Sequence, residues 1–114
     1  MKIDDVKDMT PAQLDELCNR LMGTEGRVYT CLWSHGLQAI RQLAERDERD
    51  ERYMLKFMTN SKHRECYVGV IRLDEPADEG VWWQHAEWET ISDDRAMALA
   101  RGIVALGIAR GELC

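Results

Sequence analysis

Two cysteines and two histidines are the residues of this chain best suited to chemistry. Cys31 and His35 lie one helical turn apart, and His63 and Cys66 are separated by two residues. Two such local pairs supply the ligand set of a structural zinc site. Their spacing matches no standard zinc finger, and cysteines of intracellular domains are more often buried as small apolar side chains. A zinc site built from these four residues is therefore an alternative hypothesis.

The same residues also offer thiol catalysis, with Cys31 as nucleophile and His35 as base. The sequence around them contains no third orienting group and no oxyanion-binding feature. His85, Glu87 and Glu89 alternate along an expected strand and could serve as metal ligands or as acid and base, but an exposed or partly covered polar edge is the more common explanation of such residues. No glycine-rich loop with phosphate-binding spacing precedes a helix. We therefore predict a protein that is not an enzyme and that needs no cofactor.

An acidic segment with aromatic residues offers a binding surface instead. Between Arg72 and Arg95 there are eight acidic residues, no lysine or arginine, and the tryptophans Trp82, Trp83 and Trp88. Without basic neighbours these rings do not form a base-stacking platform, and the net charge of −6 opposes binding to nucleic acid or to anionic membranes. Aromatic area combined with carboxylates suits a partner protein with a basic surface. The predicted partner-binding residues are Asp74, Glu75, Asp78, Glu79, Trp83, His85, Glu87 and Glu89.

Length and composition predict a single domain over residues 1–114, with a flexible segment at 1–9. The chain shows no signal peptide and no apolar run long enough to span a membrane, so we expect a cytoplasmic protein. The four scattered cysteines then indicate free thiols, most of them buried.

The sequence predicts two helices before the strand region and one after it. Thr10 and Gln13 form a capping box around Pro11, and Gly23 supplies a stop, which predicts a helix over residues 11–22. A second helix is expected to begin at a cap on Ser34, and it leads into eight consecutive charged residues, 45–52, which we interpret as a solvated helix end. The last helix is expected to be capped by Ser92. Its glycines at 102 and 107 are expected to let it approach the sheet closely.

Alternating apolar residues predict strands over about 53–58, 66–73 and 81–90. On the third strand we expect Trp82, Ala86 and Trp88 on the core face, and Trp83, His85, Glu87 and Glu89 on the other. Both faces of the sheet are apolar over much of their length, which predicts helices on both sides. The expected fold is α+β: a three-stranded antiparallel meander sheet sandwiched by helices, in the order α-α-β-β-β-α.

The chain resembles the phage ABA sandwich proteins, a family of small bacteriophage accessory proteins. The resemblance covers roughly residues 10–106, including the helix from Thr10 to Gly23, the Leu32, Trp33, Ser34 sequence and the alanine-rich last helix. It implies a phage or prophage accessory protein and no catalytic residues. The charged run 45–52 and the Trp82, Trp83 pair depart from the family pattern.

These observations predict a small acidic phage-type protein that binds a basic host protein and inhibits a host defence complex, in the manner of an anti-CRISPR, or a complex that handles nucleic acid. The alternative is a small zinc or thiol protein that uses Cys31, His35, His63 and Cys66. A homodimer formed through an exposed tryptophan is a third hypothesis.

Overall fold

The helices and strands follow the predicted order. The structure is a computed structural model that describes residues 1–45, 53–60, 62, 65–74 and 83–113. The elements are η1 (Ile3–Asp8), α1 (Pro11–Met22), α2 (Trp33–Glu45), β1 (Tyr53–Asn60), β2 (Glu65–Asp74), β3 (Trp83–Ser92) and α3 (Arg95–Ala109). The α+β class and the α-α-β-β-β-α order are therefore confirmed. The charged run at 46–52 lies outside the described residues.

Helix α1 begins and ends at the residues predicted for it. The Thr10 hydroxyl accepts a hydrogen bond from the backbone N–H of Gln13, and the Gln13 side chain accepts one from the Thr10 N–H. Gly23 adopts a left-handed conformation with φ of 67°, in which its N–H donates to the carbonyl of Asn19. Both ends of the helix are thus set by local contacts.

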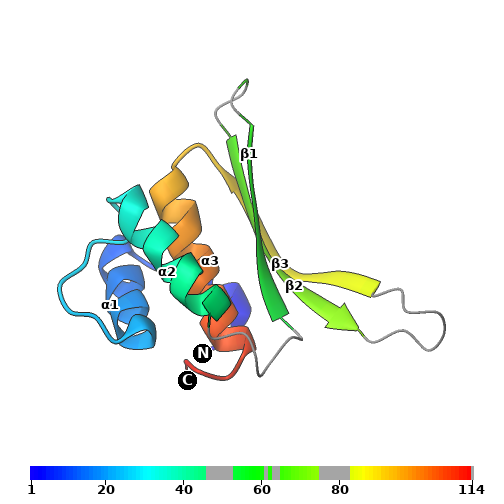
Figure 1. Ribbon diagram of the computed structural model, residues 1–114, viewed down its shortest axis with the longest axis horizontal. Helices are drawn as coiled ribbons and strands as arrows, with labels where there is room; N and C mark the ends of the chain where they lie inside the picture. The colour runs from blue at the N-terminus through cyan, green and yellow to red at the C-terminus, as the bar shows by residue number, and fades with distance from the viewer. Residues whose placement is uncertain (46–52, 61, 63–64, 75–82, 114) are drawn as a thin grey trace.

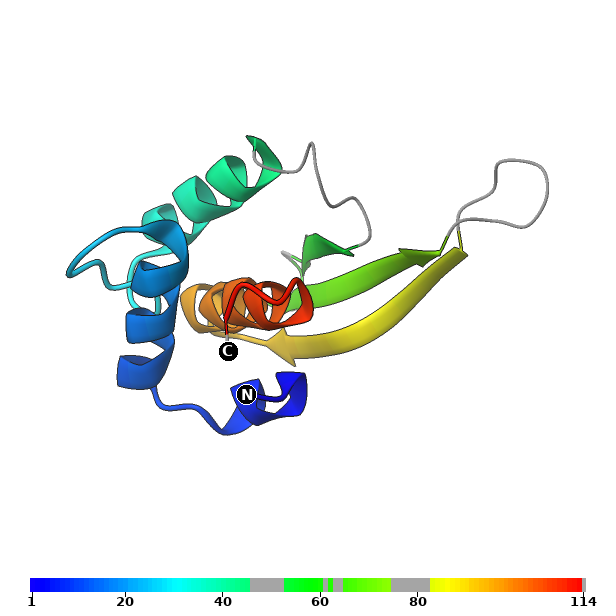
Figure 2. The ribbon, with the colours of Figure 1, turned by 90° about the horizontal axis from the view of Figure 1, so that it is seen from below.

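Helix α3 is the centre of the molecule. It contacts all three strands on one side and α1, α2 and η1 on the others (Figure 2). Ten of its residues are buried, most of them small or aliphatic. Its cap is Asp94, whose Oδ1 accepts from the Met97 N–H at 3.1 Å, and not Ser92 as predicted. Ser92 still belongs to β3, where it pairs with Cys66, so the chain leaves the sheet later than expected.

The sheet is an antiparallel meander in the order β1-β2-β3, as predicted. Cys66, Val68 and Val70 of β2 are fully buried, and Trp88 of β3 pairs with Val70 and is 3% exposed. These side chains pack with α3 in a single core. The prediction that Trp88 belongs to the core is confirmed, whereas Trp82 lies outside the described residues.

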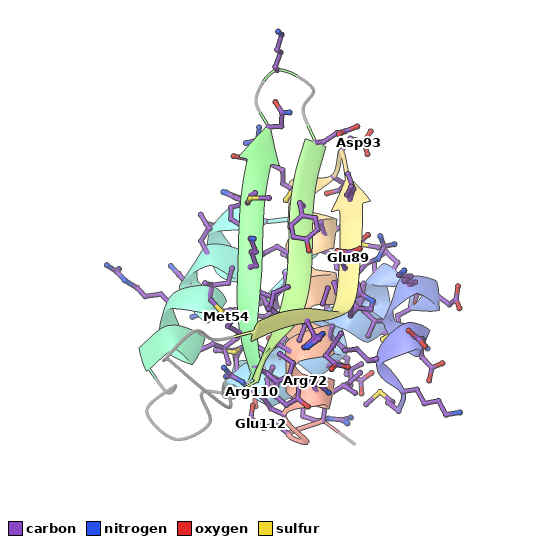
Figure 3. All side chains as sticks on the ribbon, turned by 90° about the vertical axis from the view of Figure 1, so that its right-hand side faces the viewer. Met54, Arg72, Glu89, Asp93, Arg110 and Glu112 are labelled. Carbon is purple, nitrogen blue, oxygen red and sulfur yellow. The ribbon has the colours of Figure 1, made fainter. Side chains whose placement is uncertain are left out.

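The described helices all lie on one face of the sheet (Figure 1), so the second helix layer of the predicted sandwich is not found among the described residues. The prediction rested on apolar residues at outward-facing positions of the strands. In the structure these residues differ in exposure: Met58 and Ile91, on the face away from α3, are more than half exposed and Met54 is 39% exposed, whereas Ile71 on the same face is 5% exposed. Figure 3 looks onto this face.

Gly102 allows α3 to approach the sheet, as predicted. A Cβ atom at this position would lie 2.3 Å from Val68 Cγ1 and 3.1 Å from Leu55 Cδ1. Gly107 has a different role: a Cβ there would meet Leu113 and Leu21, which belong to the C-terminal tail and to α1. Only the first of the two glycines brings helix and sheet together.

The N-terminal segment contains a short helix that the sequence did not predict. Within the segment expected to be flexible, Ile3–Asp8 form a 3-10 helix, and Val6 is fully buried in the core with α3. Its two apolar residues, Ile3 and Val6, stand among four charged ones, which is too few to show a helical period in the sequence.

Candidate functional site

The sheet face that points away from α3 is the candidate site, and we call it the open face. Strand pairing arranges its residues in three rows that cross β1, β2 and β3 in turn. The rows are Met58, Tyr67 and Ile91; Lys56, Gly69 and Glu89; and Met54, Ile71 and Ala86.

The first row is apolar and largely accessible. Met58 is 52% exposed and Ile91 is 65% exposed, and between them lies the half-buried ring of Tyr67. Large apolar side chains that are exposed singly are ordinary, but a row of them across a whole sheet is a typical mark of an interaction surface. Met and Tyr are also enriched at such surfaces.

The second row is polar at its ends. Lys56 on β1 and Glu89 on β3 are both exposed, and Gly69 lies between them. The Tyr67 side chain extends over Gly69, since a Cβ at Gly69 would lie 2.6 Å from the Tyr67 hydroxyl oxygen. That hydroxyl donates to Glu89 Oε2 at 2.9 Å (Glu89 is labelled in Figure 3). Glycine at position 69 therefore lets the Tyr67 ring lie flat on the sheet.

Burial raises the pKa of the Tyr67 hydroxyl, and the hydrogen bond to Glu89 and the charge of that carboxylate raise it further. Each cause favours the neutral phenol. The hydroxyl thus remains a hydrogen-bond donor at neutral pH, and the Tyr67 ring stays anchored to Glu89.

Shallow depressions flank the Tyr67 ring. One is lined by Met58, Thr59, Asn60, Glu65, Tyr67 and Ile91. Another, at the β3 edge, is lined by Lys7, Tyr67, Glu89, Thr90 and Ile91. Both depressions are open to solvent.

The residues predicted to share one face of β3 do not all lie on one face, because the strand is interrupted by a bulge. A bulge shifts the register between Val70 and Ile71, since Val70 pairs with Trp88 and Ile71 pairs with Ala86. Glu87 is left between the two pairs, and its Oε1 lies 2.9 Å from Arg72 Nη1. Arg72 follows Val70 by two positions and so lies on the helix-covered side. The prediction that Glu87 and Glu89 lie on one open acidic face is therefore wrong.

The other predicted partner-binding residues lie only in part within the described residues. His85 is exposed and pairs with Arg72. Asp74 and Trp83 pair with each other at the end of the sheet, although their side chains lie outside the described part of the chain. Glu75, Asp78 and Glu79 also lie outside the described residues, so the acidic loop stays a prediction.

The four residues of the zinc and thiol alternatives differ in environment. Cys31 is exposed, whereas Cys66 is fully buried on the side of the sheet that faces α3. The half-buried His35 ring packs edge-on against Tyr29, with 6.0 Å between ring centroids. His63 lies outside the described residues. Among the residues that are described, no group of three or more His, Cys, Asp and Glu is placed to hold a metal.

The two buried cysteines are present as free thiols. Burial raises the pKa of Cys18, and the nearby Asp15 carboxylate raises it further. Burial also raises the pKa of Cys66, with Arg95 acting weakly in the opposite direction. Both shifts favour the unreactive protonated thiol at neutral pH.

The residues that the sequence analysis did not identify as a site are those of the apolar row, Met58, Tyr67 and Ile91. Their apolar character was recognised, but it was interpreted as a sign of a second helix layer. A signal that could have identified them is the broad apolar surface of the last helix, α3, which has ten buried residues and covers one face of the sheet.

None of the described helices combines the length and the apolar character that a membrane crossing requires. No family model matches the chain, and searches of curated proteins and of solved structures find no match. The resemblance to phage ABA sandwich proteins therefore stays a prediction.

Proposed function

We propose that this protein is a binding protein whose contact surface is the open face of its sheet. The observation that carries the proposal is the exposed apolar row Met58, Tyr67 and Ile91, which crosses all three strands. Water contact with such a row is unfavourable by roughly 25 cal/mol for each Å² of apolar surface, so covering it supplies a driving force for association.

The polar residues around the row support specificity. Lys56 and Glu89 lie in the adjacent row at opposite sides of the sheet, and the second is held in place by Tyr67. Charges at the edge of an apolar patch orient a partner and exclude partners of the wrong charge pattern. The open face thus has the apolar centre and polar rim of a protein interface.

The charge pattern alters the expected partner. Lys56 is positive, and Glu87 is already paired with Arg72, so the described part of the surface is mixed in sign and not uniformly acidic. We therefore propose that the partner is bound by apolar contact and that the charges of Lys56 and Glu89 orient it. The phage setting and the inhibition of a host defence or nucleic-acid-handling complex stay hypotheses, and the genes adjacent to this one test them directly.

Site-specific photo-crosslinking in the native cell tests the proposed function. A benzophenone amino acid is placed at position 58 or 91, or at position 42, where the exposed Gln42 of α2 serves as the control. We expect protein adducts from 58 and 91 and none from 42. Adducts from 91 should also disappear when Met58→Asp is added, and persist with Val28→Asp, a change at an exposed apolar residue elsewhere. No adduct from 58 or 91, or equal adducts from 42, would contradict the proposal.

A further inference from the structure

We infer that the partner of the open face is a second copy of this chain, bound about a two-fold axis that lies in the interface parallel to β2. The inference rests on the proposed function and names its partner. It is drawn from the placement of Lys56 and Glu89 on either side of Gly69.

A two-fold axis between facing sheets can run along the strands or across them. An axis along β2 places the β1 side of one copy opposite the β3 side of the other. Lys56 then faces Glu89 of the second copy, and the reciprocal pair forms at the same time, as an isologous interface requires. Met58 faces the second Ile91, and the two Tyr67 rings meet near the axis.

An axis across the strands gives the opposite result. It brings Lys56 against Lys56 and Glu89 against Glu89, and both contacts are repulsive. It also places the apolar row Met58, Tyr67, Ile91 opposite the row that contains Met54. The charge pattern of the open face therefore selects the axis along β2, for which every row faces its own counterpart.

The packing of two such faces follows ordinary sheet geometry. Facing sheets in proteins pack about 10 Å apart with strands aligned to within about 30°, and strands related by an axis along β2 satisfy this alignment. The Tyr67 ring lies flat over Gly69, which leaves room near the axis for the ring of the second copy.

The size of the face indicates a weak dimer. Strands spaced about 4.8 Å apart, with a rise of about 3.3 Å per residue, give the eight residues of β1 and their neighbours an area of roughly 14 by 26 Å. A standard complex buries about 800 Å² on each partner. We therefore expect a dissociation constant of roughly 10 µM to 1 mM.

Sedimentation equilibrium at low salt, from about 10 µM to 1 mM protein, tests the inference. The wild-type chain is expected to dimerise. Lys56→Glu and Glu89→Lys should each weaken the dimer at least about tenfold, because each replaces both ion pairs by like-charge contacts. The double variant Lys56→Glu/Glu89→Lys restores both pairs with their signs exchanged, so its affinity should return to within about threefold of wild type.

The controls are changes of equal charge on other surfaces. Arg41→Glu on α2 matches Lys56→Glu, and Glu25→Lys in the loop after α1 matches Glu89→Lys, since both positions are exposed. Neither should change the dissociation constant by more than about threefold. The thermal midpoint of each variant shows that it is folded.

A wild-type chain that stays monomeric to about 1 mM, or single reversals without effect, would overturn the inference. Failure of the double variant to recover would overturn the axis along β2. The crosslinking experiment separates this inference from the proposed function. If the chain is a monomer but crosslinks from position 58 to a different protein, only the inference that the partner is a second copy is refuted. If it is a monomer and forms no adduct, the proposed function is refuted as well.

Discussion

The two faces of the sheet are built from the same strands and from similarly apolar residues, yet one face is buried beneath a helix and the other is partly exposed to solvent. On the covered face, Val68, Val70 and Trp88 are buried beneath α3. On the open face, Met58 and Ile91 keep more than half of their surface exposed. Apolar alternation therefore shows that a face is suited to burial, but not whether the same chain supplies its cover.

The difference between the faces originates in α3. Its glycine at position 102 lets the helix backbone approach Val68 and Leu55, and most of its remaining buried residues are alanine or aliphatic. The helices α1 and α2 both pack against α3, and the Trp33 ring of α2 also contacts Phe57 of β1 on the covered face, with 5.2 Å between ring centroids. None of the described helices lies on the open face (Figure 1).

The largest expected contrast is between Trp88→Ala and Ile91→Ala on the same strand. Trp88 is buried, so its truncation should lower the free energy of unfolding by about 3–5 kcal/mol. Ile91 is exposed, and its truncation should change this free energy by less than about 0.5 kcal/mol. Urea denaturation measures both. Equal losses would show that the two faces do not differ as described.

Gly102→Ala tests the close approach that covers one face. The added methyl group would overlap Val68 Cγ1, so we expect a loss of about 1–3 kcal/mol despite the better helix propensity of alanine. Adding Val68→Ala makes room for that methyl group. The double variant should therefore cost less than the sum of the single ones, by about 0.5–3 kcal/mol. Additive losses would argue against a direct contact between α3 and β2.

The buried thiols predict a loss of stability at alkaline pH. The pKa of Cys18 and that of Cys66 are raised in the folded protein, so above about pH 8.5 the unfolded chain releases protons that the folded one retains. The free energy of unfolding should fall by up to about 1.4 kcal/mol per pH unit for each thiol. Below that pH neither thiol contributes a slope.

Cys18→Ala should remove the contribution of this thiol to the alkaline slope. Any stability lost through poorer packing is the same at every pH and does not change the slope. Urea denaturation from about pH 7 to pH 10 measures the slope. An unchanged slope in Cys18→Ala would mean that this thiol is accessible to water.

The smallest expected difference is between a tyrosine in the core, Tyr29, and a tyrosine on the open face, Tyr67. The Tyr29 hydroxyl lies 2.8 Å from Thr24 Oγ1 and its residue is 1% exposed, so Tyr29→Phe should cost about 1–2 kcal/mol. Tyr67→Phe removes a hydrogen bond on the open face, where water replaces the lost partner, and should cost about 0.5 kcal/mol or less. Thermal unfolding resolves the two. A larger loss in Tyr67→Phe would indicate that this side of the sheet is shielded.

The parts of the fold that depend on neighbouring residues could be predicted from the sequence. The capping box of Thr10 and Gln13 and the stop at Gly23 are local contacts, and they are found as expected. The meander also follows from short connections between alternating segments. The same holds for the burial of Trp88.

The parts that depend on pairing between strands could not be predicted. The bulge at Glu87 arises from the register of β3 against β2, and it moves Glu87 to Arg72 and away from Glu89. The pairing of Ser92 with Cys66 likewise transfers the cap of α3 to Asp94. Strict alternation assumes an unbroken strand, so it assigned these residues to the wrong positions.

Methyl NMR of the methionines tests the central claim most directly, because the chain carries its own reporters. Met54 and Met58 lie on the open face, whereas Met22 is buried and Met97 is half-buried on α3. Between about 20 µM and 1 mM protein, we expect the methyl signals of Met54 and Met58 to shift together along one binding curve, while those of Met22 and Met97 stay in place. Constant signals from Met54 and Met58 over that range would contradict the account.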